Sequence, residues 1–240
     1  ETTLEQIYHE LASERQQEAI EKIVAGASFD HGIICSHEQF VLAPDEQYED
    51  ALELFLETGK VWYTDDPKLV QKLRDVVFPD GSLNKDVVGI PASEIAKMVE
   101  IDIPSSTKLI LLPASGAGTE DLLAKEKLCP VIAIMRYKSF DDAVAKAKSN
   151  LLVEGAGHSA ALHSHNNEHI QKAGLELPIS RLVINQPSSL TAGGSLTNGF
   201  APTTTLGCGS WGGNSISENL DYKHLMNISR IGKIIQDKIV

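Results

Sequence analysis

The feature that most constrains the fold is a regular alternation of short apolar segments with amphipathic segments along most of the chain. The short segments are rich in β-branched and aliphatic residues, as strands are, and the longer ones repeat apolar residues at helical spacing. Strands are expected within 32–44 and at 61–64, 107–113, 130–137, 159–164 and 181–186, and helices at 1–26, 46–60, 66–77, 139–152 and 166–175. This order predicts an α/β layered fold with a largely parallel sheet.

Several helix boundaries can be predicted from single residues. Ser13 can interrupt or cap the amino-terminal helical segment, which is expected to end near Gly26. Asp45 is placed to cap the helix that follows it, and Pro67 stands just inside the start of the next one. The remaining long segment, 187–219, is rich in Gly, Ser, Thr and Asn, but it also contains Phe200 and is therefore expected to be an ordered loop.

Composition excludes several classes of protein. The chain has 240 residues, 42% of them hydrophobic, which suits one large domain with a single core. No apolar run approaches the roughly 20 residues of a membrane helix, and the amino terminus does not resemble a signal peptide. A net charge of −12 opposes binding to nucleic acid or to anionic lipid. Three cysteines without short spacing favour a reducing cytoplasm over a disulfide framework.

Among these cysteines, Cys35 is the candidate nucleophile. It follows an Asp-His-Gly turn and precedes a strand, so its thiol can lie at the mouth of a sheet. Backbone N–H groups or a cationic neighbour there favour the thiolate over the thiol, whose free pKa is about 8.5. The alternative is a buried cysteine that behaves as a small hydrophobic residue, and this alternative is stronger for Cys129, which precedes an apolar strand.

A glycine motif and a histidine cluster each suggest a binding site. Gly207, Gly209 and Gly212 match G-x-G-x-x-G, but no buried strand precedes them and no helix follows, so these glycines more simply let the backbone approach a ligand or the sulfur. His158, His163, His165 and His169 lie close in sequence. They lack the spacing and the acidic or cysteine partners of a metal site, so no metal is predicted. Among these histidines, His158 follows a flexible Gly-Ala-Gly and is the best candidate for a polar group in a cleft. A catalytic pair of Cys35 with either His158 or His37 also stays open.

Four blocks of sequence together resemble one known family. The segment 29–39 (FDHGIICSHEQ) is similar to the catalytic segment of the CoA-acylating aldehyde dehydrogenases, and KEKLCPVIA, EGAGHSAALHS and TLGCGSWGGNSISEN extend the similarity in the same order. The resemblance covers roughly residues 14–232 and is greatest to the acetaldehyde and succinate-semialdehyde enzymes, including the aldehyde module of bifunctional aldehyde-alcohol dehydrogenases. It implies a three-layer α/β catalytic domain over 1–240, with 1–13 as an atypical amino-terminal helix.

The resemblance also implies roles for individual residues. Cys35 would attack the aldehyde, hydride would pass to NAD or NADP, and coenzyme A would release the acyl group as a thioester. Glu126 matches the glutamate that holds the nicotinamide ribose, and Gly209 belongs to the block expected on the cofactor side. His158 matches a histidine of the acylating branch and is assigned to acyl transfer.

One departure from the family pattern limits these expectations. The dinucleotide-binding domain of the family has no counterpart in the chain, so the chain is expected to fold but not to turn over. The expected partners are a small aldehyde, coenzyme A and the missing nucleotide-binding domain, with a homo-oligomer in the full-length protein. Two alternatives stay open, namely a non-catalytic assembly fragment of the same family and an independent cysteine hydrolase.

Overall fold

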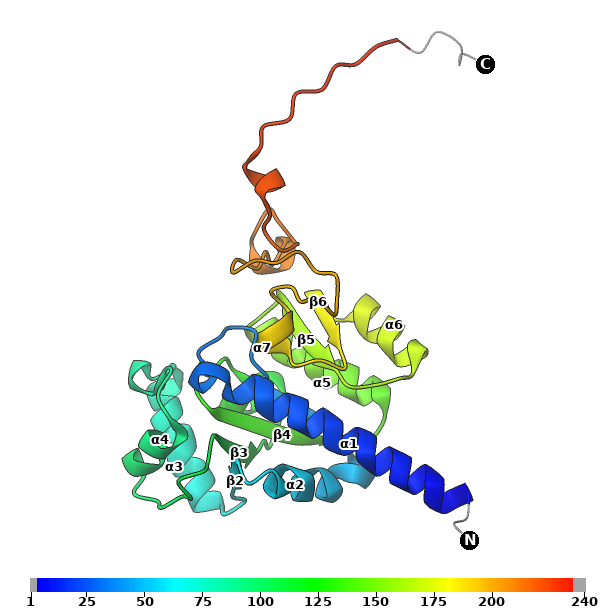
Figure 1. The fold of residues 1–240 in the computed structure, drawn as a ribbon. Helices are drawn as coiled ribbons and strands as arrows, with labels where there is room; N and C mark the ends of the chain where they lie inside the picture. Colours follow the sequence, from blue (N-terminus) through cyan, green and yellow to red (C-terminus); the bar gives the residue numbers. More distant parts are fainter. Residues whose placement is uncertain (1–3, 235–240) are drawn as a thin grey trace.

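A four-stranded parallel sheet lies at the centre of the computed structural model, which describes residues 4–234, with side chains from Glu14 onward (Figure 1). The strand order is β1-β4-β3-β2. The bounds are β1 Phe40–Pro44, β2 Val61–Tyr63, β3 Leu109–Pro113 and β4 Val131–Tyr137. All neighbouring pairs are parallel, as the alternation of strands and helices predicts.

The two central strands are buried on both faces. Along β3, Leu109 and Leu111 point to one side of the sheet, and Ile110 and Leu112 point to the other, because successive side chains of a strand alternate. All four are fully buried. A strand covered on both faces needs an almost continuous apolar run, and this is why β3 and β4 are so easily predicted from the sequence.

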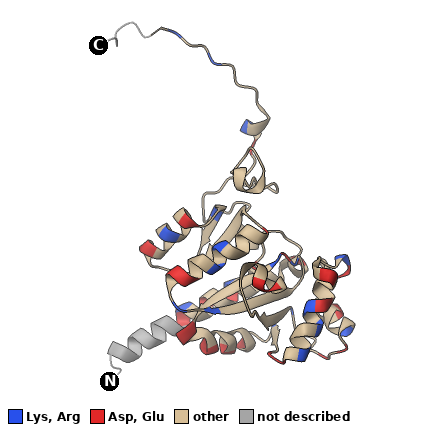
Figure 2. Cartoon of the chain, turned by 180° about the vertical axis from the view of Figure 1, so that it is seen from behind, with Lys and Arg blue, Asp and Glu red and all other residues tan. Residues whose placement is uncertain are grey.

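Helices cover each face of this sheet, which confirms the predicted three-layer α/β architecture. The first face packs against α1 (Leu4–Ser28) and α2 (Tyr48–Glu57), which contribute Val24 and Phe55 to the core. The second face packs against α3 (Pro67–Val77) and α4 (Ala92–Met98), which contribute Leu73 and Ile95. Charged residues lie mainly on the helices and loops, and the strands are mostly uncharged (Figure 2).

A second, two-stranded parallel sheet stands beside the first, where the sequence predicted only more of one sheet. It consists of β5 (Gly157–Leu162) and β6 (Ile179–Ile184). With α5 (Phe140–Val153) and α6 (Asn167–Glu176) it forms a smaller core around Val144 and Ala173. The site described below lies at the start of β5.

The boundaries of α1 and α2 differ from the prediction, and the start of α3 agrees with it. Helix α1 runs continuously through Ser13 and past Gly26 to Ser28, because a serine costs only about 0.5 kcal/mol within a helix that its neighbours favour. Asp45 does not cap α2, since it begins a separate 3₁₀ turn. Helix α3 starts as predicted, with Pro67 in its first turn and the Asp66 side chain accepting a hydrogen bond from Lys68 N at 2.8 Å.

The Gly-rich segment after β6 is an ordered loop, as predicted. It begins with the short helix α7 (Ser188–Thr191) and closes on itself through a bridge between Leu206 and Asn219. The buried Asn219 amide donates to Ala192 O at 3.0 Å and to Ala201 O at 2.8 Å. After Leu225 the chain extends away from the body (Figure 1). In the described part of the chain, no helix is long and apolar enough to cross a membrane.

Candidate active site

Cys35 lies in an exposed turn between the end of α1 and the start of β1. The turn needs a left-handed backbone at Asp30, His31 and Gly32. A Cβ at Gly32 would come within 2.7 Å of Cys129 O, so this glycine lets the turn pack directly against the segment that precedes β4. Because β1 and β4 are parallel neighbours, the segments before them meet at one edge of the sheet, and Cys35 is held there.

His158, at the start of β5, lies beside the thiol. Its Nε2 is 3.2 Å from Cys35 Sγ, although the two residues are 123 positions apart. This is hydrogen-bonding distance for a nucleophile and its base. The structure therefore brings together two of the predicted site residues. The buried His37 ring instead bonds Ile34 O through Nδ1 at 2.9 Å, and among the described residues no hydrogen bond joins it to the thiol.

The other nitrogen of the imidazole is also bonded. His158 Nδ1 lies 3.2 Å from Ser159 Oγ, and Arg181 Nε donates to the same hydroxyl oxygen at 3.1 Å. A base whose second nitrogen is held by a third group has the arrangement of a catalytic triad. Sequence reasoning missed Ser159 and Arg181. The available signal was an arginine inside an otherwise apolar strand.

Electrostatics favours neutral forms of the pair. Although Cys35 is exposed as a residue, partial burial of its thiol raises the thiol pKa, and the Glu126 carboxylate raises it further. Burial lowers the pKa of His158, and the neighbouring Arg181 guanidinium lowers it further. Near neutral pH the site therefore holds a thiol beside an imidazole that is free to accept its proton.

The three cysteines differ sharply in accessibility, which predicts selective alkylation. Cys129 is completely buried, and burial raises its thiol pKa to about 11. Iodoacetamide is expected to modify Cys35 at least about a hundredfold faster than Cys129, because Cys129 reacts only after local unfolding. Peptide mapping of the native protein checks this. Equal labelling of both residues would contradict the exposed position of Cys35.

Glu126 is placed near the same edge of the sheet, just before β4. Its carboxylate is half-buried and makes no hydrogen bond or ion pair with the described residues, while its backbone N–H donates to Glu154 Oε2 at 2.9 Å. Burial raises the pKa of Glu126, and the Glu154 carboxylate raises it further. An unpaired carboxylate beside another one suits neutral hydroxyl donors, such as those of a ribose, better than an anionic phosphate.

Gly209 shapes the loop beside the site. Its φ of 59° favours glycine, and a Cβ there would lie 2.8 Å from Ser217 Cβ. Its N–H donates to Ile216 O at 2.8 Å, and its carbonyl accepts from Asn214 N at 2.7 Å. Any cofactor contact at Gly209 therefore depends on the shape of this turn rather than on a free backbone donor.

Two other histidines of the sequence cluster, His163 and His169, are placed outside the Cys35 site. His169 stacks on Phe140 with ring centroids 3.9 Å apart. His163 is largely buried, and this burial lowers its pKa to about 4. Among the described residues, no three His, Cys, Asp or Glu side chains are grouped so that they could hold a metal ion.

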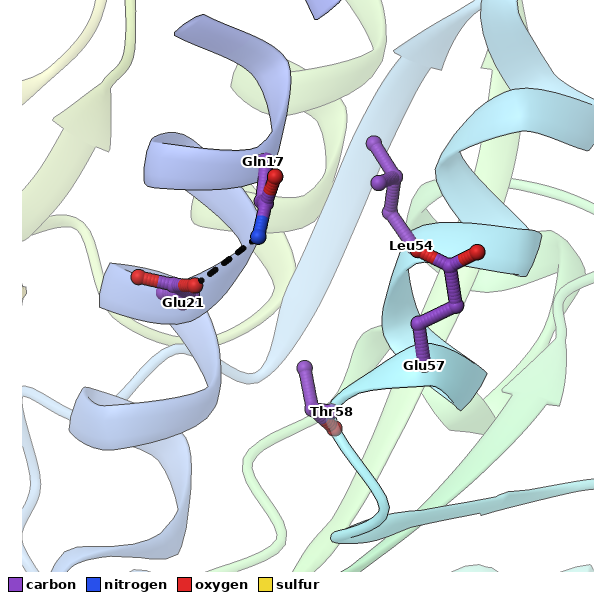
Figure 3. Close-up of a pocket in the computed structure, with 5 residues that line it drawn as sticks. All are labelled: Gln17, Glu21, Leu54, Glu57 and Thr58. Carbon is purple, nitrogen blue, oxygen red and sulfur yellow. Dashed lines mark hydrogen bonds between the residues drawn. The ribbon is translucent and has the colours of Figure 1, made fainter. Parts of the chain in front are cut away.

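A depression between α1 and α2 is separate from this site (Figure 3). In it, Gln17 Nε2 donates to Glu21 Oε1 at 3.3 Å. Leu54, Glu57 and Thr58 complete the lining. None of these residues belongs to the Cys35 site, so we assign no catalytic role to the depression.

Comparison with known proteins gives two informative relatives. Over 89% of its length the chain is 51% identical to a succinate-semialdehyde dehydrogenase (acetylating) of Clostridium kluyveri. Over 90% it is 36% identical to the bifunctional aldehyde-alcohol dehydrogenase AdhE of Escherichia coli. The chain spans 47% of the first relative and 24% of the second. No family model matches the chain.

A solved structure extends the likeness to the fold. The crystal structure of an acetylating aldehyde dehydrogenase from Geobacillus thermoglucosidasius superimposes with a TM-score of 0.86 at 29% identity. The match covers 93% of this chain and 49% of the other. By sequence and by fold, the chain belongs to the acylating aldehyde dehydrogenases and corresponds to about half of such a protein.

Proposed function

We propose that the chain is the catalytic-cysteine part of an NAD- or NADP-dependent, CoA-acylating aldehyde dehydrogenase. It would convert a short aldehyde to its acyl-CoA, and acyl-CoA back to the aldehyde. The main observation that supports this proposal is the 3.2 Å contact between Cys35 Sγ and His158 Nε2 in a chain with this sequence and fold. We propose that Cys35 and His158 are the catalytic residues, and that Glu126 and Gly209 contribute to cofactor binding.

The proposed mechanism uses one thiol for both half-reactions. His158 Nε2 accepts the thiol proton while Cys35 Sγ forms a bond to the aldehyde carbon, which gives a thiohemiacetal. After loss of hydride the carbon becomes a thioester on Cys35. Once His158 has passed the first proton to solvent, it accepts the proton of the coenzyme A thiol as that sulfur bonds to the thioester carbon. The bond from carbon to Cys35 Sγ then breaks, and His158 returns the proton to the released Cys35 thiolate.

A nicotinamide cofactor, when bound, supplies the hydride acceptor for the first half-reaction. The half-buried Glu126 carboxylate fits a diol such as a ribose, because it is free to accept two hydroxyl hydrogen bonds. We place the rest of the nucleotide site in a separate domain outside this chain, since the relative from Clostridium kluyveri is about twice as long. We propose that the full-length protein is a cytoplasmic homo-oligomer.

Acyl exchange tests the proposal without a nicotinamide cofactor. The chain is incubated with acetyl-CoA or succinyl-CoA, and the adduct is located by peptide mass mapping. A stable thioester on Cys35, with free coenzyme A released in equal amount, supports the proposed function. No adduct would favour a non-catalytic assembly fragment, and rapid release of free acid would favour a cysteine hydrolase.

A further inference from the structure

Arg181 is a charged residue in the interior of strand β6, with only 3% of its surface exposed. Its guanidinium donates to Gly207 O at 2.8 Å, to His158 O at 3.1 Å and to Gly157 O at 3.3 Å. Arg181 Nε donates to Ser159 Oγ at 3.1 Å. These acceptors are uncharged, so no carboxylate offsets the cost of burying the guanidinium.

A buried charge without an ionic partner is an expensive way to stabilise a strand, since an apolar side chain of similar volume often does as well. The partners of Arg181 suggest what the charge is for. Two of the bonds go to the backbone carbonyls of Gly157 and His158, which flank the His158 Cα, and a third goes to the hydroxyl that bonds the His158 ring. Arg181 therefore contacts the backbone of His158 directly and its imidazole through Ser159.

We propose that Arg181 is a positioning residue that holds the His158 imidazole against Cys35 through the Ser159 hydroxyl. The inference rests on the proposed function in one respect, because it assumes that His158 serves the Cys35 thiol. Arg181 itself touches neither the sulfur nor, in this proposal, the substrate.

The direction of the hydrogen bonds explains why the serine matters. Because Arg181 occupies one lone pair of Ser159 Oγ, the hydroxyl can either accept from His158 Nδ1–H or donate to an unprotonated Nδ1. With Ser159 accepting from Nδ1–H, Nε2 is free to take the proton of Cys35, and the imidazolium so formed still donates from Nδ1 to Ser159 while its Nε2–H donates to the thiolate. The ring therefore stays in place before and after the transfer, as a base that must accept and return a proton requires.

The same guanidinium also ties the Gly-rich loop to the site. Arg181 Nη1 donates to Gly207 O, and the following residue, Cys208, lies so close to Gly157 that a Cβ on that glycine would overlap the Cys208 carbonyl. The loop, the start of β5 and the imidazole are thus held by one side chain. Loosening the guanidinium is expected to affect all three together.

The test measures how fast iodoacetamide alkylates Cys35 as a function of pH. Ser159→Ala is expected to slow alkylation near neutral pH about tenfold, because His158 loses the hydrogen bond that orients it. Arg181→Lys is expected to cause a similar loss, since an ammonium cannot reproduce the planar fork. The double variant is expected to be no slower than Arg181→Lys alone, and Ser159→Ala is expected to have no effect in a His158→Ala background.

Ser180→Ala is the matched control. It makes the same exchange one position before Arg181, and the buried Ser180 Oγ has no hydrogen-bond partner among the described residues. Its alkylation profile is expected to match that of the unaltered protein. Near-ultraviolet circular dichroism checks the folding of each variant, and the Ser159→Ala comparison decides the question if Arg181→Lys does not fold.

Two results would overturn the positioning role. One is an unchanged profile for Ser159→Ala. The other is a Ser159→Ala effect that adds fully to that of Arg181→Lys, because the two residues would then act separately. Alkylation needs no coenzyme A, so the two proposals fail separately. A chain that is not acylated by acyl-CoA but shows the coupled alkylation profiles would contradict the proposed function and still support the role of Arg181.

Discussion

Replacing Cys35 by alanine is expected to abolish acyl transfer from acyl-CoA to the protein, a loss of at least about a thousandfold. The reason is that, among the described residues, Cys35 has the thiol that lies within hydrogen-bonding distance, 3.2 Å, of His158 Nε2. Mass spectrometry of the intact protein after incubation with acetyl-CoA gives the rate of adduct formation. The same variant is expected to fold normally, because Cys35 is exposed.

Cys208→Ala is the control for this result. Cys208 is a half-buried thiol in the loop beside the site, and its Sγ lies 3.8 Å from Leu206 O. We expect Cys208→Ala to retain the Cys35 adduct. An adduct that persists in Cys35→Ala and maps to Cys208 would move the nucleophile to the Gly-rich loop and contradict the proposed assignment.

The second large effect is expected on stability, from Asp121→Ala. The Asp121 side chain is 1% exposed and receives two hydrogen bonds of 3.0 Å from Arg74 on α3. It also accepts from Ser115 N at 2.8 Å and from Leu123 N at 2.9 Å. Removing the carboxylate deprives the Arg74 guanidinium of its ionic partner and leaves two N–H groups without this acceptor, so we expect the free energy of unfolding to fall by about 3–5 kcal/mol. Urea denaturation measures it.

The surface pair of Lys97 with Glu94 provides the matched control. Its side chains are 70% and 49% exposed, so Glu94→Ala is expected to change the free energy of unfolding by less than about 0.5 kcal/mol. Equal losses in the two variants would contradict the importance of burial at Asp121.

The Asp121 site also predicts a dependence of stability on pH. Burial alone raises the pKa of this carboxyl, but the hydrogen bonds from Leu123, Ser115 and Arg74 outweigh burial, so the pKa lies below its usual 3.8. A lowered pKa in the folded state contributes stability that is present above the unfolded pKa and is lost as pH falls through the folded one. The stability difference between the unaltered protein and Asp121→Ala is therefore expected to shrink below about pH 4.

Much of the fold could be predicted from sequence because its signals are local. The apolar runs at 109–113 and 131–137 specify strands that are buried on both faces, and amphipathic segments elsewhere, such as 67–77 and 140–153, specify helices. The separate sheet of β5 and β6 could not be predicted, because its strands have the same local pattern as the others. Helix α4, which is only seven residues long, was also missed.

The candidate site shows the same division. The sequence by itself determined which segments form strands and helices, that Cys35 follows a tight turn before a strand, and which family the chain resembles. It favoured His158 as the partner of the thiol and left His37 open as an alternative. Only the tertiary structure decided between them, because His37 turns toward Ile34 O while His158 arrives from 123 residues away. The contacts of Ser159 and Arg181 with His158 are likewise visible only in the tertiary structure. Hydrogen bonds between segments distant in sequence depend on how the sheets pack together, and a local pattern of residues carries no information about that packing.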